Sequence, residues 1–160
     1  KLFYENIEYF LQEYTTWVKV STIGGVQNAF DNENYLSFTP ENITTFYSSR
    51  DNLGKQFENI NWTYVGGYEI YDVSGYENLK ILTLNYDSGD IEEFELSILN
   101  DERIELYNVV SETTYKFSGR GFVKYLKEVK SKKEAKDIVR NTGRKRTKIE
   151  RKTMNRRNLK

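Results

Sequence analysis

The sequence lacks cysteine and histidine altogether and contains a single proline, Pro40. Without cysteine the chain can form no disulfide, no thiol nucleophile and no zinc–thiolate site. Without histidine it lacks the usual acid–base group at neutral pH, the commonest metal ligand and the central residue of a Ser-His-Asp triad. We therefore predict no catalytic residue, no metal site and no cofactor.

Long hydrophobic runs are also missing. No stretch approaches the roughly 18 apolar residues of a membrane-spanning helix, so no membrane span is expected. No secretory signal peptide is recognisable either. The absence of cysteine is compatible with both reducing and oxidising compartments. Localisation therefore stays open, with a virion or an intracellular assembly favoured and the cell envelope or secretion as the alternative.

Aromatic residues, by contrast, are abundant. They make up 15% of the chain, with 13 tyrosines, although hydrophobic residues overall reach only 38%. Tyrosine and phenylalanine favour strands and half-buried sheet faces. A chain of 160 residues suits one domain with a sizeable core plus an appendage. The composition therefore favours a mainly β domain.

The net charge of zero conceals two parts of opposite charge. Residues 1–123 contain 8 Lys and Arg against 20 Asp and Glu, whereas residues 124–160 contain 16 against 4. No aromatic residue follows Tyr125. This change of composition predicts a division of the chain into three regions. They are an N-terminal helix (1–15), a β-barrel (16–121) and a basic C-terminal segment (122–160).

Apolar spacing in the first 15 residues is helical. Phe3, Ile7, Phe10 and Leu11 recur at three- and four-residue intervals within residues 2–14. This spacing predicts a short amphipathic helix. Its polar face is acidic, which favours a lid packed on one end of the barrel over a membrane anchor.

From residue 16 onward the apolar period changes to two, which is typical of strands. The clearest alternation places Phe94 and Leu96 on one face and Glu93 and Glu95 on the other. Turn residues such as Gly66-Gly67 separate the segments. Eight or nine antiparallel strands at this spacing favour a meander that closes into a barrel. The strands are expected near residues 16–23, 34–39, 42–49, 57–64, 68–73, 79–87, 90–99, 103–110 and 113–118.

Helical spacing returns after the barrel. A weak apolar stripe runs through residues 122–140, and Asn141-Thr142-Gly143 is a suitable helix end. Residues 144–160 are basic and offer only a few apolar side chains. The fold class is therefore predicted as mainly β, with an 8–9-stranded antiparallel meander barrel, a short N-terminal helix, a C-terminal helix and a basic extension.

The order of these segments resembles that of lipocalin-like domains. Residues 16–20 (Thr-Trp-Val-Lys-Val) open the first strand after a helix, where the family has Gly-x-Trp. Residues 35–38 lead through a tight turn into 43–47, Asn61-Trp62-Thr63-Tyr64 lies mid-barrel, and residues 96–106 precede a last strand and Arg120. The resemblance is to the calycin-type domains common in Bacteroidetes and covers about residues 10–121; the basic segment has no counterpart there.

The resemblance implies how one end of the barrel is closed. In lipocalins an arginine beyond the last strand covers the tryptophan of the first strand. The corresponding residues here are Arg120 and Trp17, and a cation–π contact between them would be worth about 1 kcal/mol.

The predicted barrel interior contains many aromatic residues. A barrel of eight strands is either just filled by side chains or holds one small ligand. The aromatic content favours a filled interior, in which Val18 and Val20 of the first strand also take part. A ligand, if bound, would be apolar or aromatic. The residues expected to line its cavity are Phe38, Phe46, Trp62, Tyr64, Phe94 and Tyr115.

Two acidic groups deserve comparison with known sites. Paired carboxylates can hydrolyse a glycosidic bond, but Glu93 and Glu95 lie on a strand face that is expected to be exposed, where little raises a pKa. Residues 87–90 (Asp-Ser-Gly-Asp) lack the ligand spacing of a calcium-binding loop. We interpret the first pair as solvated and the second segment as a hairpin turn, so an enzyme is not expected.

The basic segment is the sharpest candidate for an interaction site. A solvated tail is the ordinary interpretation of such a run, and docking onto an acidic or larger partner is the functional one. Its clustered charges could also neutralise phosphates, although without aromatic residues it offers no base stacking. The predicted docking residues are Arg144, Lys145, Arg146, Lys148, Arg151, Lys152, Arg156 and Arg157.

Three functions are compatible with the sequence. The first is a structural or adaptor subunit of a larger assembly, such as a phage virion or a ribosome-like particle, in which the barrel is a rigid body and the basic segment docks onto other protein subunits. The second is a secreted, lipocalin-like carrier of a small apolar ligand. The third is an accessory protein that binds nucleic acid through the basic segment.

Overall fold

The computed structural model describes residues 6–123, and the following elements lie within this range. Helix α2 spans Ile7–Gln12 and precedes all of the strands. Three short 3-10 turns lie in the connections: η1 (Ala29–Asn32), η2 (Glu41–Ile43) and η3 (Phe57–Asn59). The strands are β1 (Tyr14–Ile23), β2 (Tyr35–Thr39), β3 (Thr45–Ser49), β4 (Tyr64–Val73), β5 (Tyr76–Tyr86), β6 (Ile91–Asn100), β7 (Arg103–Asn108) and β8 (Thr113–Phe122).

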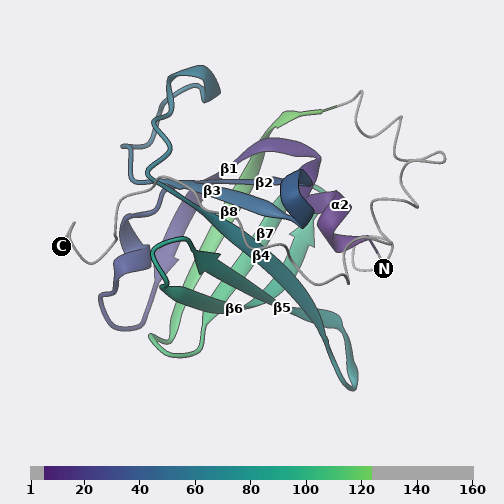
Figure 1. Cartoon of the computed structure of the whole chain (residues 1–160). Helices are drawn as coiled ribbons and strands as arrows, with labels where there is room; N and C mark the ends of the chain where they lie inside the picture. Colours follow the sequence, from purple (N-terminus) through teal and green to yellow (C-terminus); the bar gives the residue numbers. More distant parts are fainter. Residues whose placement is uncertain (1–5, 124–160) are drawn as a thin grey trace.

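The eight strands form a closed barrel in sequence order, β1 to β8 (Figure 1). Every neighbouring pair is antiparallel, and β1 pairs with β8 to close the sheet, with Trp17 opposite Gly119. The predicted mainly β fold, the meander barrel and the short N-terminal helix are therefore confirmed. The predicted C-terminal helix and basic extension lie outside the described residues, apart from positions 122 and 123, of which Phe122 is the last residue of β8 rather than the start of a helix.

Alternation of polar and apolar residues explains why the strands present one face to the core. In β6, Phe94 and Leu96 are fully buried, while Glu93 and Glu95, which alternate with them, point away from the core. The same period continues in β7, where Ile104 is buried. Burial of each such side chain contributes about 1.5–3 kcal/mol.

Strand β4 corrects two boundaries inferred from the sequence. The expected strand at 57–64 is instead the turn η3 followed by a loop, and β4 begins only at Tyr64. The expected turn at Gly66-Gly67 lies inside β4, paired with β5. A Cβ on Gly66 would come within 2.1 Å of the carbonyl oxygen of Asn85. Glycine is therefore required at this position by the close approach of the neighbouring strand rather than by a turn.

Strand β1 corrects the predicted interior. The buried residues of this strand are Thr16, Trp17 and Lys19. Val18 is half-buried, and Val20 is 45% exposed. Because side chains alternate across a strand, the inward position of Trp17 forces Val18 to the other face. A register shift between Lys19 and Ser21 relative to β8 adds an irregularity at Val20.

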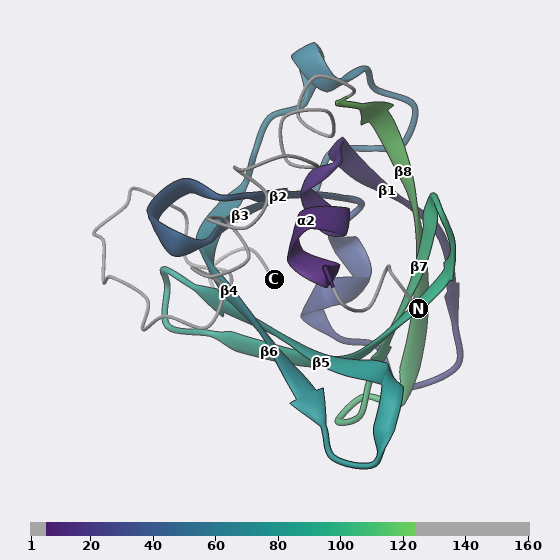
Figure 2. The same cartoon turned by 90° about the vertical axis from the view of Figure 1, so that its right-hand side faces the viewer.

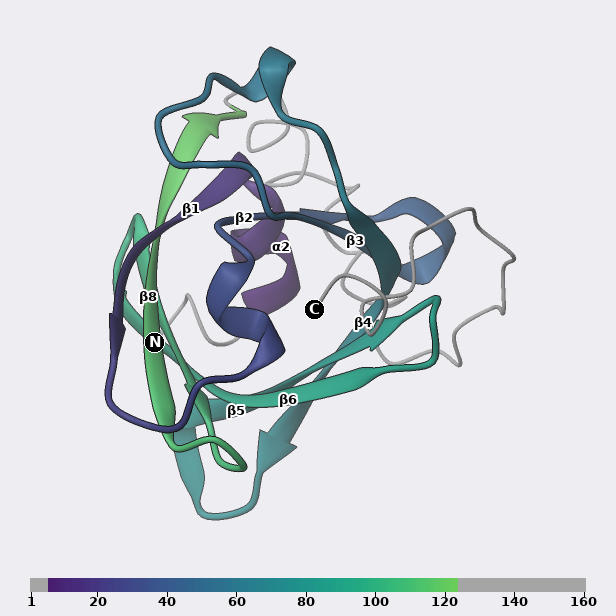
Figure 3. The same ribbon diagram turned by 90° about the vertical axis from the view of Figure 1, so that its left-hand side faces the viewer.

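Each end of the barrel is covered by a different short helical segment. Helix α2 lies across the end where β1 begins and β8 finishes (Figure 2), and we call this the α2 end. The segment that joins β1 to β2, containing η1, lies across the opposite end (Figure 3), which we call the η1 end. The N-terminal helix therefore covers one end of the barrel, as predicted, and the η1 segment covers the other end.

Candidate functional site

The α2 end is built around Trp17. Its side chain is fully buried, its Nε1 donates a hydrogen bond of 2.8 Å to the carbonyl oxygen of Leu11, and its ring lies 5.6 Å from the ring of Phe10. Helix α2 is thus anchored directly to the first strand. This explains how six helical residues, too few to be stable alone, keep a fixed position.

Arg120 does not cover Trp17 as the resemblance implied. Its side chain is exposed, and Nη1 donates to Ser118 Oγ at 2.5 Å and to the carbonyl oxygen of Gly119 at 3.2 Å. Gly119 is the residue paired with Trp17, so the next residue, Arg120, points to the other side of the barrel wall. The expected cation–π contact is therefore replaced by backbone and hydroxyl contacts.

Tyr14 lies where that arginine was expected. Its ring lies 5.1 Å from Trp17, and a Cβ on Gly119 would come within 2.5 Å of Tyr14 Cγ. The Tyr14 hydroxyl donates to the carbonyl oxygen of Asp101 at 2.9 Å. Burial raises the pKa of Tyr14 to about 12, and the nearby carboxylate of Asp101 makes a smaller contribution in the same direction. The ring therefore covers Trp17 in its neutral form.

A neutral hydrogen-bond chain completes the α2 end. Gln12 Nε2 donates to Tyr68 Oη at 2.8 Å, and the Tyr68 hydroxyl donates to the carbonyl oxygen of Thr39 at 3.2 Å. Both side chains are buried, and burial raises the pKa of Tyr68 far above its ordinary value. Satisfied polar groups of this kind fix the orientation of a helix over an apolar core.

Five of the six residues proposed to line a ligand cavity lie in the barrel core, where they pack on other rings. Phe38 lies 5.0 Å from Tyr68, and Phe46 lies 5.0 Å from Tyr86, each ring edge towards face. Edge-to-face packing of this type adds to the stabilisation from buried area. The remaining contacts of the set are Tyr64 with Tyr86 at 5.7 Å and Phe94 with Tyr115 at 6.2 Å.

Trp62, the sixth residue, is not brought together with the other five. It lies in the loop before β4, half-buried, with its ring 6.1 Å from Tyr47 and 6.2 Å from Phe57. Tyr47 points outward between the inward-facing Phe46 and Ser48, so this aromatic group lies on the outer surface.

The η1 end is closed by Phe30, a residue that the sequence did not single out. Its ring is fully buried, 4.7 Å from Phe94 and 4.9 Å from Tyr115. The turn η1 is held by a capping box: Asn28 Oδ1 accepts a hydrogen bond from the Phe30 amide, and Asp31 Oδ2 accepts one from the Asn28 amide. The Asn-Ala-Phe-Asp spacing was the available signal for this turn.

Lys19 is an unexpected charged residue inside the barrel. Its Nζ donates to the carbonyl oxygen of Asp31 and lies 5.5 Å from the centre of the Tyr115 ring. Burial lowers the pKa of Lys19, and the carboxylates of Asp31 and Glu33 partly oppose this shift. The Tyr115 hydroxyl also donates to Asp31 Oδ1 at 2.7 Å, so the lysine and the tyrosine both bind the η1 turn.

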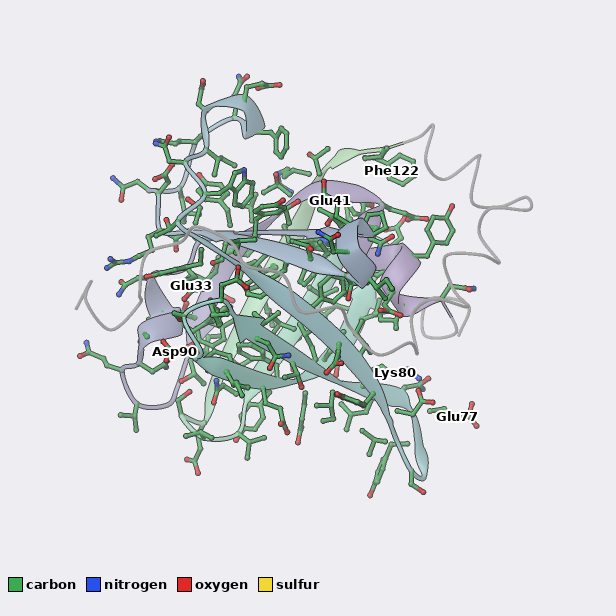
Figure 4. All side chains as sticks on the ribbon, in the orientation of Figure 1. Glu33, Glu41, Glu77, Lys80, Asp90 and Phe122 are labelled. Atoms are coloured by element: carbon green, nitrogen blue, oxygen red, sulfur yellow. The ribbon has the colours of Figure 1, made fainter. Side chains whose placement is uncertain are left out.

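Glu33 is the second charged residue of this end (Figure 4). It is fully buried, and its Oε1 accepts hydrogen bonds from Ser48 Oγ and from Tyr86 Oη, both at 2.6 Å. These bonds connect the end of the η1 segment to β3 and β5. A buried carboxylate is tolerated when it is hydrogen-bonded in this way.

The outer surface of the described part is strongly acidic. Residues 6–123 contain 7 Lys and Arg against 19 Asp and Glu. Glu93 and Glu95 lie on this surface, as expected. The predicted docking residues of the basic segment, from Arg144 to Arg157, lie outside the described residues.

No group of three or more acidic side chains within residues 6–123 is arranged to hold a metal ion. No helix in the same range has the length and the apolar character needed to cross a membrane. Comparisons of the chain with protein families, with curated proteins and with solved structures find no match.

Proposed function

We propose that this protein is a non-enzymatic adaptor subunit of a larger assembly, such as a virion or a ribosome-like particle. In this proposal the barrel is a rigid body, and the basic residues 124–160 dock onto an acidic or larger protein partner. We also propose that the barrel follows the lipocalin plan, with a helix before the first strand and a tryptophan near its start.

The packing of the barrel interior carries this proposal. The aromatic residues that could have lined a ligand cavity lie against one another, and Trp17 and Phe30 close the two ends from inside. A protein interior packed with rings resists deformation. This arrangement favours a rigid scaffold over a carrier, which needs an open space for its ligand.

The concentration of positive charge in residues 124–160 would attach the barrel to a partner. The segment 124–160 carries 16 basic and 4 acidic residues. A basic segment of this kind is attracted to an acidic surface over about 8–10 Å at physiological salt. A patch of one sign also accelerates association with a partner of the opposite sign.

The test uses the full tagged chain, expressed in its source cells and separated by size. The adaptor elutes with a protein partner at a fixed ratio, and nuclease treatment leaves that ratio unchanged. In the docking variant we expect at least about a tenfold loss of the partner, because several charged contacts are removed together. The docking variant carries Arg144→Gln, Lys145→Gln, Arg146→Gln, Arg156→Gln and Arg157→Gln.

A matched control separates position from total charge. It removes the same number of positive charges near the start of the segment and is expected to keep the partner. The control carries Lys124→Gln, Lys127→Gln, Lys130→Gln, Lys132→Gln and Lys133→Gln. Release of the chain by nuclease would support the nucleic-acid function instead. Elution as a monomer with a bound apolar molecule would support the carrier.

A further inference from the structure

The outer face of β4 to β7 carries a row of four side chains, three of them aromatic or aliphatic, across four neighbouring strands. Tyr71 of β4 is opposite Ile81 of β5, Ile81 is opposite Glu95 of β6, and Glu95 is opposite Tyr107 of β7. Tyr71 is 50% exposed, and Ile81 and Tyr107 are half-buried. We call this row, together with the carboxylates beside it, the acidic face.

Carboxylates flank the row on both sides. Glu93 and Glu105 join Glu95 on the outward positions of β6 and β7, and Glu69 lies beside Tyr71, whose hydroxyl donates to it at 2.5 Å. The ion pairs within residues 6–123 include Lys55 with Asp51 and Lys80 with Asp72. Glu93, Glu95 and Glu105 take part in neither of these pairs, and the residue opposite Glu105 on β8 is Lys116.

This combination selects the chemistry of a partner. An apolar row bordered by carboxylates suits a segment in which lysines and arginines flank a few aliphatic side chains. It repels nucleic acid and the anionic surface of a membrane, because both carry the same sign of charge as the face. A basic, partly apolar peptide segment is the occupant that fits.

We propose that the acidic face binds the basic segment of the same chain, residues 124–160. This proposal rests on the proposed function, because it concerns the segment that docks onto a partner there. The segment begins next to the barrel: the Val123 amide donates to the carbonyl oxygen of Glu13 at 2.6 Å. The row is reached by running back along the barrel wall, because Tyr107 is opposite Thr114, nine residues before Val123. At about 3.3 Å per extended residue, roughly the first nine residues of the segment span this distance, and the rest of it can lie along the face.

Attachment to the same chain favours this occupant over a second copy. A tethered segment acts at an effective concentration of about millimolar, which exceeds ordinary protein concentrations. The segment supplies aliphatic residues for the row as well as charge, including Ile138, Val139 and Ile149. An acidic partner must then compete with the barrel for the segment, so the barrel regulates docking.

The test measures trypsin cleavage within residues 124–160 of the full chain by mass spectrometry. In the face variant, at low salt, we expect cleavage about tenfold faster than in the wild type, and 0.5 M salt, roughly, should abolish the difference by screening. The face variant carries Glu93→Gln, Glu95→Gln and Glu105→Gln. The control variant carries Glu58→Gln, Glu77→Gln and Glu112→Gln, three exposed acids outside the row, and should behave as wild type.

Two further measurements decide the outcome. Carbodiimide coupling of the wild type should join Glu93 or Glu95 to a lysine of residues 124–160 within a monomer, and thermal unfolding should show that all variants are folded. Equal cleavage of wild type and face variant overturns the proposal. Protection that increases with protein concentration also overturns it, in favour of a second copy. If the face variant is cleaved at the wild-type rate but the chain still binds its assembly partner, this proposal is wrong and the proposed function remains supported.

Discussion

The two ends of the barrel are closed by different chemistry. At the α2 end, Trp17 packs against a helix, and the buried polar pair Gln12 and Tyr68 is neutral. At the η1 end, Phe30 fills the same role, but the buried groups around it include Lys19 and Glu33. Glu8 and Glu13 of the α2 end are buried as well, so the two ends differ in the sign of their buried charges: the α2 end has carboxylates only, and the η1 end combines a carboxylate with a lysine.

The difference has consequences for stability. Apolar closure depends on filled volume, and its loss leaves a cavity. Closure that includes charge depends on hydrogen bonds and on protonation, because a buried ion without its partner is costly. The α2 end should therefore respond most to changes of side-chain size, with a pH dependence from its buried tyrosines above pH 10, and the η1 end should respond to pH through its buried lysine.

The largest expected effect is at the α2 end. Replacement Trp17→Ala removes a fully buried ring and frees the Leu11 carbonyl. We expect the free energy of unfolding to fall by about 3–5 kcal/mol, measured by urea denaturation. The half-buried Trp62→Ala is the matched control and should cost about 1 kcal/mol. Similar losses for the two variants would contradict the assignment of Trp17 to the core.

At the η1 end the corresponding change is Phe30→Ala. Phe30 lies in a four-residue turn that can open separately from the barrel, so we expect a smaller loss of about 2–3 kcal/mol. Hydrogen exchange should become faster for the amides of residues 26–34 while those of β5 stay protected. Equal acceleration throughout the barrel would mean that the two ends are not independent.

The neutral pair of the α2 end can be tested with Tyr68→Phe. The change leaves Gln12 Nε2 without its acceptor, which should cost about 1–2 kcal/mol at pH 7. The pKa of Tyr68 is raised, so its hydroxyl stabilises the fold fully below pH 10, the ordinary value, and this contribution is lost as the pH rises towards the folded-state pKa. Denaturation from pH 9 to pH 11 should show a shallower decline for the variant than for the wild type.

The charged residue of the η1 end has the opposite dependence on pH. The pKa of Lys19 is lowered, so between its folded-state pKa and its ordinary value of 10.5 the unfolded chain binds more protons. Stability therefore increases with pH in that window. Lys19→Met keeps an apolar stem of similar length but removes the hydrogen bond to the Asp31 carbonyl oxygen, so we expect a loss of about 1 kcal/mol at pH 7. The free energy of unfolding of the wild type should increase relative to that of the variant as the pH approaches 10. A difference that stays constant with pH would contradict the buried position of Lys19.

The sequence was sufficient for the parts of the fold that rest on local pattern. The alternation around Phe94 and the helical spacing of Ile7, Phe10 and Leu11 predicted β6 and α2, because burial follows directly from a period of 2 or 3.6. The face of β1 was misjudged because Val20 is more hydrophobic than Lys19. The position of Trp17 in the closed barrel determines that face, and this is a tertiary effect.

The candidate site was harder to infer for the same reason. The ring contacts of Phe46 and Tyr86 join strands that are far apart in the sequence. Gly66 was predicted to lie in a turn, which is one common position of glycine. Glycine also occurs in strands where a neighbouring strand approaches closely, and only the pairing with β5 distinguishes these two cases. Phe30 lies in a loop, where no period indicates burial.

The smallest expected change in the free energy of unfolding tests the contribution of backbone conformation, rather than packing, at the η1 end. Glu112, in the turn between β7 and β8, is exposed and has a φ of 57°, a left-handed value that glycine adopts at no steric cost. Glu112→Gly should therefore raise the unfolding free energy by about 0.5–1 kcal/mol. The control Glu77→Gly, at the exposed start of β5 near the α2 end, should lower it by a similar amount, because glycine in a strand loses more conformational entropy on folding. Thermal unfolding of the two variants should thus shift in opposite directions, and a shift in the same direction would show that turn conformation does not limit the stability of the η1 end.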